Sequence, residues 1–301
     1  MLDYLRRWLT SPWGLAAFLG AACFTASAET LVTLLVDENY PPYAYRAADG
    51  SAAGIYPDIL RAAEPRLRGY RLKLQPLLWR RALAEVEAGE ALALVPPYVR
   101  PHERPFIGRY SVPLLEEQVA VFCRQSVLAE RPRQRWPDDF YGLRFGINFG
   151  SLAPGAAYWQ AVERKQILME EAPGTRSNLQ KMMRGRIDCF AFDRISTLGV
   201  LADLRRSGRY DEKRDERIAE GPVVNRDTAH VGYTGRDRGR FPFKEDFAAQ
   251  LDKALEALRD SGRSRRLSDT TRTDAARTNQ GWLSSLRSGT PSLSTGDLMT
   301  M

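Results

Sequence analysis

The stretch YPPYAYRAADGSAAGIYPDIL, residues 40–60, combines aromatic rings, prolines and turn-forming residues. Side chains such as Tyr40 and Tyr43 can cover the apolar or cationic part of a small molecule with their ring faces. The adjacent prolines stiffen the loop, and Gly54 would let the backbone come close to a ligand. Trp79 is a further candidate for the same surface, although each of these rings could equally be a plain core residue. Together they predict one wall of a small-molecule cleft.

Groups suited to covalent or acid–base chemistry are scarce. His102 and His230 are the two histidines of the chain, and the sequence has no HExxH, GxSxG or P-loop motif. Histidine-based catalysis therefore has few places to occur. We predict no catalytic residues, no metal and no cofactor.

The cysteines Cys123 and Cys189 lie in apolar, strand-like runs, VAVFC and IDCFAF. No CxxC spacing indicates a metal site. An oxidising compartment would permit a disulfide between the two. The interpretation that we favour is two buried, small apolar residues.

Apolar runs rich in strand formers alternate with amphipathic runs along the chain. We expect strands at residues 31–36, 71–77, 91–95, 119–123, 143–149, 187–192 and 228–233, and helices at residues 57–63, 79–88, 158–165, 177–184, 196–206 and 244–259. Such alternation is typical of parallel strands joined by crossover helices. The sequence therefore predicts two α/β units.

In open α/β sheets the ligand crevice lies at the carboxyl ends of the strands. Suggestive residues occur at five such places: residues 40–43, residues 96–98, residues 150–151, Asp193, and the loop that holds Arg104. We expect these segments to meet around one cleft.

Five motifs follow one another in the chain: ENYPPYAYRAADGSAAGIYPDIL, WRRALAEVEAGEALALVP, PHERPFIGRYSVPL, GLRFGINFGS and GRIDCFAFDR. In this order and spacing the chain resembles the amino-acid-type periplasmic solute-binding proteins, bacterial extracellular solute-binding protein family 3, over about residues 30–268. The resemblance implies an α/β, two-lobed type II periplasmic-binding-protein fold. Each lobe would be a mostly parallel sheet flanked by helices, with the ligand cleft between the lobes.

The resemblance also implies how the chain divides. Lobe 1 would comprise residues 29–122 plus 222–268, and lobe 2 residues 125–220. The lobes would close by a hinge motion around residues 119–125 and near Gly221.

Several residues acquire expected roles from the resemblance. Arg104 matches an arginine that grips the ligand carboxylate with its planar fork, and the alternative is a surface pair with Glu103 or Glu116. Gly150 and Ser151 match a turn that opens a helix, whose N–H groups would take the same carboxylate. Alternatively, or in addition, Ser151 is an ordinary N-cap.

Asp193 matches a carboxylate that binds the ligand's α-amino group, and the alternative is an N-cap for the helix at Ser196. Tyr98 completes the predicted ligand-binding set. It lies in Pro-Pro-Tyr, residues 96–98, where amino-acid binders usually have a small Gly/Ser/Thr-rich run. Pro101 stands where the family has a threonine before the arginine. These two departures weigh against an α-amino acid as the ligand.

The ends and the charge of the chain indicate export. Residues 1–28 have the basic start, short apolar run and small residues of a signal peptide cleaved after Ala28, which predicts a periplasmic location; an uncut membrane anchor is the alternative. Residues 269–301 are predicted to be a disordered tail. The formal charge is +7, but the arginines are scattered, so no nucleic-acid partner is expected.

We therefore expect an exported, monomeric solute-binding protein that captures a small polar or carboxylate-bearing ligand, an amino acid or a related compound, between two closing lobes. It would serve an ABC-type permease or a sensor. One alternative is an enzyme on the same fold, similar to cyclohexadienyl dehydratase, with Glu103 or Asp193 as the acid. The other is an interaction domain that has no ligand.

Overall fold

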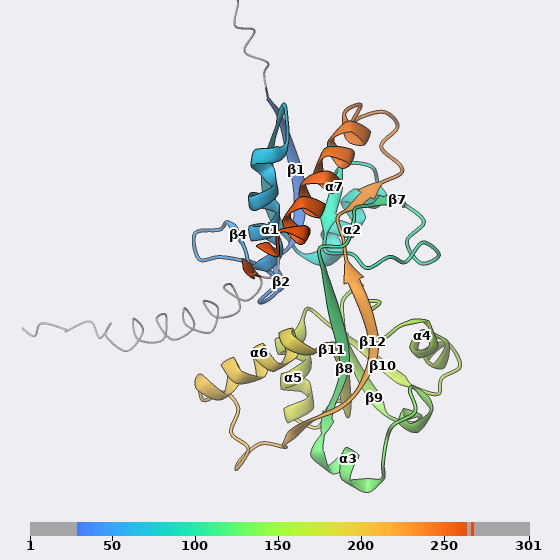
Figure 1. The fold of residues 1–301 in the computed structure, drawn as a ribbon. Helices are drawn as coiled ribbons and strands as arrows, with labels where there is room; N and C mark the ends of the chain where they lie inside the picture. The colour runs from blue at the N-terminus through green and yellow to red at the C-terminus, as the bar shows by residue number, and fades with distance from the viewer. Residues whose placement is uncertain (1–28, 264–265, 268–301) are drawn as a thin grey trace, which may run out of the picture.

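The computed structural model describes residues 29–263 and 266–267. The predicted signal peptide and the predicted tail at residues 269–301 lie outside the described residues. Within this part of the chain, two lobes are joined by a pair of long strands (Figure 1). None of its helices has the length and apolar character needed to cross a membrane.

Lobe 1 is built on a five-stranded sheet in the order β5-β1-β6-β13-β7. The strands are β1 (Thr30–Asp37), β5 (Tyr70–Leu77), β6 (Ala93–Val95), β7 (Ile107–Tyr110) and β13 (Gly232–Thr234). β1 pairs in parallel with β5 and β6, whereas β13 runs antiparallel to β6 and β7. The helices of this lobe are α1 (Ile55–Ala63), α2 (Trp79–Glu87) and α7 (Lys244–Asp260), with a short 3-10 helix η1 (Glu64–Arg66).

Helices cover both faces of this sheet, which explains why β1 reads as a continuous apolar run. Because side chains alternate along a strand, Leu34 and Val36 pack in the cluster that includes residues of α1 and α7. Leu35 packs in a second cluster with residues of α2. The three side chains are at most 2% exposed.

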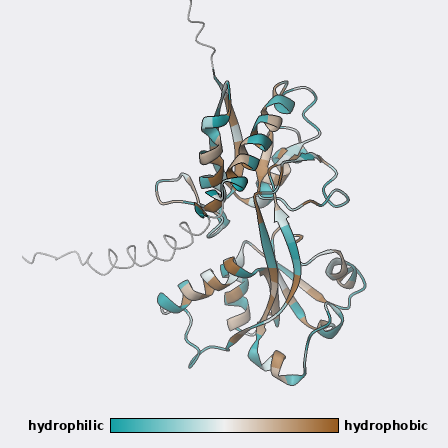
Figure 2. Cartoon of the chain, in the orientation of Figure 1, coloured by the Kyte–Doolittle hydropathy of each residue, from teal (hydrophilic) through white to brown (hydrophobic). Residues whose placement is uncertain are grey.

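Lobe 2 is built on a second five-stranded sheet, in the order β10-β9-β11-β8-β12. The strands are β8 (Leu115–Arg124), β9 (Arg144–Asn148), β10 (Leu168–Ala172), β11 (Cys189–Asp193) and β12 (Ile218–Ala229). β9 pairs in parallel with β10 and β11, and β8 runs antiparallel to β11 and β12. The helices are α3 (Gln125–Glu130), α4 (Ala156–Glu163), α5 (Thr175–Met183) and α6 (Arg194–Arg206), with a 3-10 helix η2 (Asp138–Phe140). Apolar residues concentrate along the strands of both lobes (Figure 2).

The two lobes are connected by β8 and β12, which run side by side between them (Figure 1). Their antiparallel register pairs Leu115 with Ala229 at one end and Arg124 with Ile218 at the other. β12 carries two register shifts within residues 220–225. The lobe boundaries and the hinge positions given by the sequence stay predictions.

The tyrosine-rich segment folds into a small sheet of β2 (Asn39–Tyr40), β3 (Ala44–Arg46) and β4 (Ala52–Ala53). Gly54 follows with a φ of 112°, and a Cβ there would lie 2.6 Å from the carbonyl oxygen of Tyr43. The glycine therefore allows two segments of this chain to approach each other. We had predicted that it makes room for a ligand instead.

Cys123 and Cys189 form a disulfide, contrary to the interpretation that we favoured from the sequence. They are directly opposite each other on the antiparallel strands β8 and β11, with their Cα atoms 4.0 Å apart. Both residues are fully buried. The strand prediction for the two apolar runs was correct, but it contained no information on which strands are neighbours.

The predicted strand at residues 228–233 is the largest error in the secondary structure. β12 ends at Ala229 and β13 begins at Gly232, so the segment is shared by two strands that belong to different sheets. Most of β12 alternates between intermediate and exposed residues, which weakens its apolar signal. β7 and β10 were not predicted at all.

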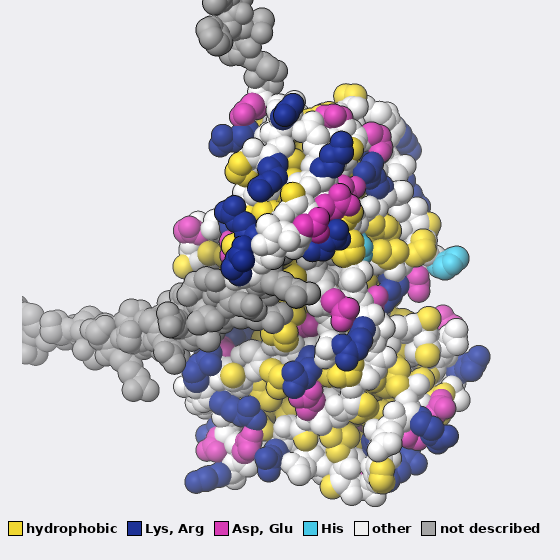
Figure 3. All heavy atoms as spheres, viewed as in Figure 1, with side chains coloured by type: hydrophobic (Ala, Val, Ile, Leu, Met, Phe, Trp, Pro, Cys, Tyr) yellow, Lys and Arg dark blue, Asp and Glu magenta, His cyan; other side chains and the backbone are white. Residues whose placement is uncertain are grey.

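Charged side chains are distributed over the surface of both lobes. On the face shown in Figure 3, basic and acidic groups are interspersed. Many belong to ion pairs between exposed groups, such as Arg46 with Glu38 and Arg194 with Glu220.

Candidate functional site

A pocket of about 570 Å³ lies between the two lobes. Lobe 1 contributes Asp37, Asn39, Tyr40, Leu78, Trp79, Arg80, Arg81, Ala84, Pro96, Tyr98 and Arg104. Lobe 2 contributes Asn148, Phe149, Ser151, Leu152, Ala153, Pro173, Gly174 and Phe192. Many of these residues lie at or just after the carboxyl ends of β1, β6, β9 and β11. Open α/β sheets bind their ligands at this edge.

Arg104 is the buried cation of this pocket. It is 6% exposed, although it lies in a loop between β6 and β7. Its Nη2 donates to the carbonyl oxygen of Gly150 at 2.8 Å, and its guanidinium lies 5.3 Å from the Trp79 ring. Burial lowers the pKa of Arg104 to about 10.

No carboxylate among the described residues forms an ion pair with this arginine. Glu103 is exposed, and Glu116 lies 3.6 Å from Arg226. The alternative of a surface pair with Glu103 or Glu116 is therefore wrong. Within residues 29–263 and 266–267, the positive charge of Arg104 thus lies next to the pocket without an ion-pair partner.

Ser151 lines the pocket and Gly150 does not, and the two residues do not open a helix. α4 begins at Ala156 with Gly155 as its N-cap, so neither the expected helix N-terminus nor the N-cap role of Ser151 is correct. The Ser151 hydroxyl accepts from the Ala153 N–H at 3.3 Å in a local turn. The Gly150 carbonyl accepts from Trp79 Nε1 at 3.4 Å as well as from Arg104, and so joins the two lobes.

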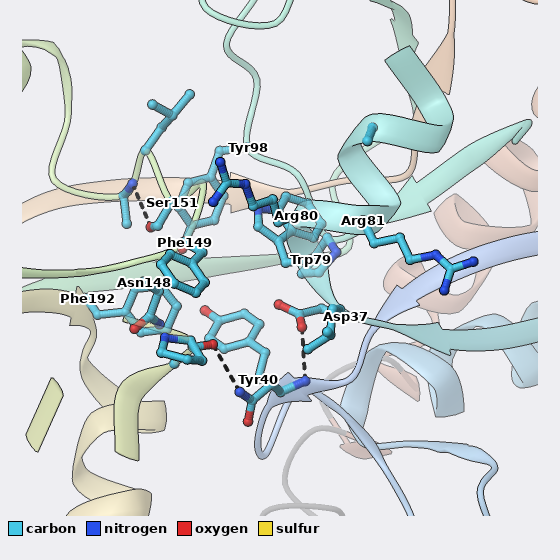
Figure 4. Close-up of a pocket in the computed structure, with 18 of the residues that line it drawn as sticks. Asp37, Tyr40, Trp79, Arg80, Arg81, Tyr98, Asn148, Phe149, Ser151 and Phe192 are labelled. Carbon is cyan, nitrogen blue, oxygen red and sulfur yellow. Dashed lines mark hydrogen bonds between the residues drawn. The ribbon is translucent and has the colours of Figure 1, made fainter. Parts of the chain in front are cut away.

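Three of the predicted aromatic residues line the pocket: Tyr40, Trp79 and Tyr98. Figure 4 shows them with Phe149 and Phe192 of lobe 2 around the same cavity. Tyr43 does not line it.

Tyr43 is fully buried in the core of lobe 1. Its ring stacks on the Tyr56 ring at a centroid distance of 5.4 Å, and it lies 5.0 Å from the Tyr40 ring. The side chain therefore supports the pocket wall from behind. The sequence predicted both tyrosines at the ligand because they lie in one loop. Their spacing does not show in which direction each ring turns on either side of the Pro-Pro pair.

Asp193 is the N-cap of α6, as the alternative interpretation proposed. Its Oδ1 accepts from the Ser196 N–H at 2.7 Å, and the Tyr43 hydroxyl lies 3.4 Å from its Oδ2. The residue is fully buried and is not part of the pocket lining, where its neighbour Phe192 takes its place. This arrangement keeps the carboxylate away from the cavity described here.

Sequence analysis missed several lining residues. Asp37 is the last residue of β1 and Asn39 begins β2. The Asp37 carboxylate accepts from the Asn39 N–H at 2.9 Å. Burial raises the pKa of Asp37 to about 7. The Asn39 side chain donates to the Pro173 carbonyl across the cleft at 3.1 Å. The strand-end rule that selected Tyr40 would have found both residues had it been applied to the whole loop.

Besides Asp193, a second buried carboxylate lies behind Tyr40 and Tyr98, the two tyrosines that line the pocket. Glu117 on β8 is 1% exposed and accepts from the hydroxyls of Tyr40, Tyr56 and Tyr98. Burial raises its pKa, whereas the three tyrosine hydrogen bonds act in the opposite direction. The pKa values of the three tyrosines lie well above 10, mainly because the rings are buried, so their hydroxyls keep their protons and donate.

Comparisons with known proteins agree on the fold. The family of bacterial extracellular solute-binding proteins, family 3, matches residues 32–271. A search of curated proteins gave no match.

Among solved structures, the sensor domain of a histidine kinase with similarity to periplasmic binding proteins has a TM-score of 0.64 at 15% identity, covering 80% of this chain and 96% of that chain. The amino acid ABC transporter substrate-binding protein AbpA from Streptococcus pneumoniae, bound to L-arginine, has a TM-score of 0.61 at 16% identity, covering 81% and 95%. An ancestral amino acid-binding protein, a precursor of cyclohexadienyl dehydratase, has a TM-score of 0.59 at 12% identity, covering 80% and 94%.

These similarities are too low in identity to transfer a ligand, but the family match covers most of the chain. With the two-lobed α/β architecture and the pocket between the lobes, it identifies the chain as a ligand-binding protein. The chain belongs to the bacterial extracellular solute-binding proteins, family 3.

Proposed function

We propose that this protein is exported to the periplasm and captures a small carboxylate-bearing ligand, an amino acid or a related compound, between its lobes. The observation that carries the proposal is Arg104, a buried guanidinium at the pocket without an ion-pair partner among the described residues. Burying an unpaired charge is costly, and an arginine fork pairs with a carboxylate through two charge-assisted hydrogen bonds. A ligand carboxylate would supply the missing partner.

The remainder of the pocket suits an organic solute. Its volume of about 570 Å³ lies within the usual range for small-molecule sites. Tyr40, Trp79, Phe149 and Phe192 offer ring faces from both lobes, which favours a ligand with an apolar or cationic portion. Among our sequence-predicted residues, Tyr40, Trp79, Tyr98, Arg104 and the turn at 150–151 make up the proposed binding set.

We further propose that the lobes close around the ligand by bending at β8 and β12, and that the closed protein is read by an ABC-type permease or a sensor. The solved structures of similar fold include both kinds of protein, a transporter component and a kinase sensor domain. The mature protein would act as a monomer.

The two acids that the sequence suggested for the dehydratase-like alternative are not placed for that role. A general acid must come within hydrogen-bond reach of its substrate. Glu103 is exposed and Asp193 caps α6, and neither lines the pocket.

The test is a thermal-shift screen of the mature protein, unfolded and refolded with its disulfide intact to remove carried-over ligand. The panel contains amino acids, polyamines and small carboxylic acids. A ligand at about 100 times its dissociation constant adds about 2.7 kcal/mol to the free energy of unfolding, or roughly 5–10 °C at this size.

The shift should vanish in Arg104→Ala and persist in the control Arg66→Ala, since Arg66 is exposed and donates to the Ala62 carbonyl. A shift that survives in Arg104→Ala would refute the carboxylate clamp. A panel without any carboxylate hit would refute the proposed ligand class.

A further inference from the structure

Glu117 is a buried carboxylate without a cationic partner in the described part of the chain. It lies on β8, one of the two strands that connect the lobes, and is 1% exposed. Its Oε1 accepts from the Tyr56 hydroxyl, and its Oε2 accepts from the hydroxyls of Tyr40 and Tyr98. These three tyrosines come from three separate segments of lobe 1.

Cations in the neighbourhood are engaged elsewhere. The Arg100 guanidinium lies 5.7 Å from the Tyr98 ring, but it forms two hydrogen bonds with Asp227 on β12. Asp227 is also the residue directly opposite Glu117 in the β8–β12 ladder. Arg100 and Asp227 therefore neutralise each other, and the negative charge of an ionised Glu117 is balanced by neither.

The hydrogen bonds to Glu117 fix how two pocket residues can act. Tyr40 and Tyr98 both line the pocket, and the single hydroxyl proton of each is directed to Glu117. A tyrosine hydroxyl has one proton and can otherwise only accept. Towards a ligand in the pocket, these hydroxyl oxygens can therefore only accept a hydrogen bond. The ring faces beside them attract cations.

We propose that Glu117, although it does not line the pocket, sets the charge preference of the pocket by keeping the wall of Tyr40 and Tyr98 in its accepting state. The wall then favours ligand groups that donate hydrogen bonds or carry positive charge, and disfavours carbonyl and carboxylate oxygens. With Arg104 taking the carboxylate, a ligand with an adjacent ammonium group would satisfy both charges. Glu117 would thus favour the ligand's ammonium group, the role that we expected of Asp193, which instead caps α6. This inference rests on the proposed function, because it concerns the same pocket.

Glu117→Gln is the informative change because it retains the shape while removing the charge. The amide offers one acceptor and one donor group. The amide oxygen can accept from at most two of the three tyrosine hydroxyls, so at least one of them must turn its proton elsewhere. In every arrangement the negative charge behind Tyr40 and Tyr98 is lost.

The experiment is calorimetric titration of the refolded protein with matched pairs that differ only in the ammonium group. Suitable pairs are L-phenylalanine with 3-phenylpropanoate, L-leucine with 4-methylpentanoate, L-glutamate with glutarate, and L-arginine with 5-guanidinopentanoate. We expect the wild type to bind the amino form at least about tenfold more tightly, the lower end for a hydrogen bond to a charged group.

Glu117→Gln should reduce this ratio about tenfold and change the affinity for the des-amino acid little. Its control is Glu116→Gln, the same chemical change at a side chain that is 64% exposed and paired with Arg226, which should leave the ratio intact. Tyr98→Phe removes one hydroxyl of the wall and should also lower the ratio, so the test does not depend on one variant folding.

Equal binding of both members of each pair by the wild type would overturn the inference while leaving the carboxylate clamp in place. A Glu117→Gln variant that weakens both members equally would assign Glu117 a purely structural role. Failure of every carboxylate to bind would refute the proposed function, and this inference with it.

Discussion

Replacing Arg104 by methionine should abolish ligand binding without destabilising the ligand-free protein. Methionine fills a similar length with an apolar side chain, so the change removes the buried charge and its hydrogen bond to Gly150 while retaining much of the packing against Trp79. A residue kept for binding is expected to cost stability in the absence of its ligand.

The magnitude follows from the burial of the guanidinium. Burial lowers the pKa of Arg104 to about 10, a shift that corresponds to about 3 kcal/mol of disfavoured charge. Because the folded-state pKa lies below the unfolded value, this penalty is complete at neutral pH and is relieved only as the pH rises above about 10. The hydrogen bond to Gly150 returns about 1.5–3 kcal/mol. Arg104→Met should therefore leave the free energy of unfolding unchanged or raise it by up to about 1.5 kcal/mol.

A second buried arginine provides the matched control. Arg133 is 7% exposed, but it donates to the carbonyls of Val127 and Asp139 and forms an ion pair with Glu130. It is satisfied within the protein, so Arg133→Met should lower the free energy of unfolding by about 2–4 kcal/mol.

Urea denaturation of both variants and the wild type, without ligand at neutral pH, measures these differences directly. If Arg104→Met lost as much stability as Arg133→Met, Arg104 would be a structural residue. The argument for the carboxylate clamp would then fail whatever the ligand screen showed.

Three further predictions address the scaffold. Replacing both Cys123 and Cys189 by alanine should lower the free energy of unfolding by about 4 kcal/mol for this loop, which spans 66 residues; urea denaturation without that loss would contradict the assigned cross-link. Asp37, whose pKa is raised to about 7 by burial, makes the folded ligand-free protein bind a proton that the unfolded chain releases. Stability should therefore rise as the pH falls from about 7 towards 4. Asp37→Asn should remove this pH dependence, so the substitution should stabilise the protein more at pH 8 than at pH 5. Parallel pH profiles of melting temperature for wild type and variant would contradict this role of Asp37. Gly54→Ala should lower the free energy of unfolding by at least about 3 kcal/mol, because its φ is 112° and a Cβ there clashes with the backbone. The control Gly50→Ala, at a φ of 84° with no atom near the added Cβ, should lower it by about 1 kcal/mol. Equal losses in denaturation experiments would show that the close approach at Gly54 is not the cause.

Much of the fold was predictable because its central strands are apolar and its helices amphipathic. β1 is buried on both faces, and the helix predicted at residues 244–259 is observed as α7, Lys244–Asp260. β10 was missed because its pattern LMEEA is mostly exposed. β12 was misplaced because Pro222 and charged residues interrupt a strand that is held by its long pairing with β8.

The candidate site was predictable where a residue lies at the end of a strand. That rule selected Tyr40 and Tyr98, and the family pattern selected Arg104. It did not show which way a side chain turns, so Tyr43 and Asp193 were predicted at the ligand although they are buried away from the pocket. Glu117 gave no sequence signal at all, because its importance depends on three tyrosines that meet only in three dimensions.

The passage of the chain between the lobes through β8 and β12 has a mechanical consequence. Two strands that are hydrogen-bonded to each other behave as a single ribbon, which bends and twists far more easily than it stretches or shears. If the lobes close as we propose, such a ribbon limits their relative motion to a few rotations, and we expect the bending to concentrate at the register shifts within residues 220–225. A partner would then recognise the angle between the two lobes.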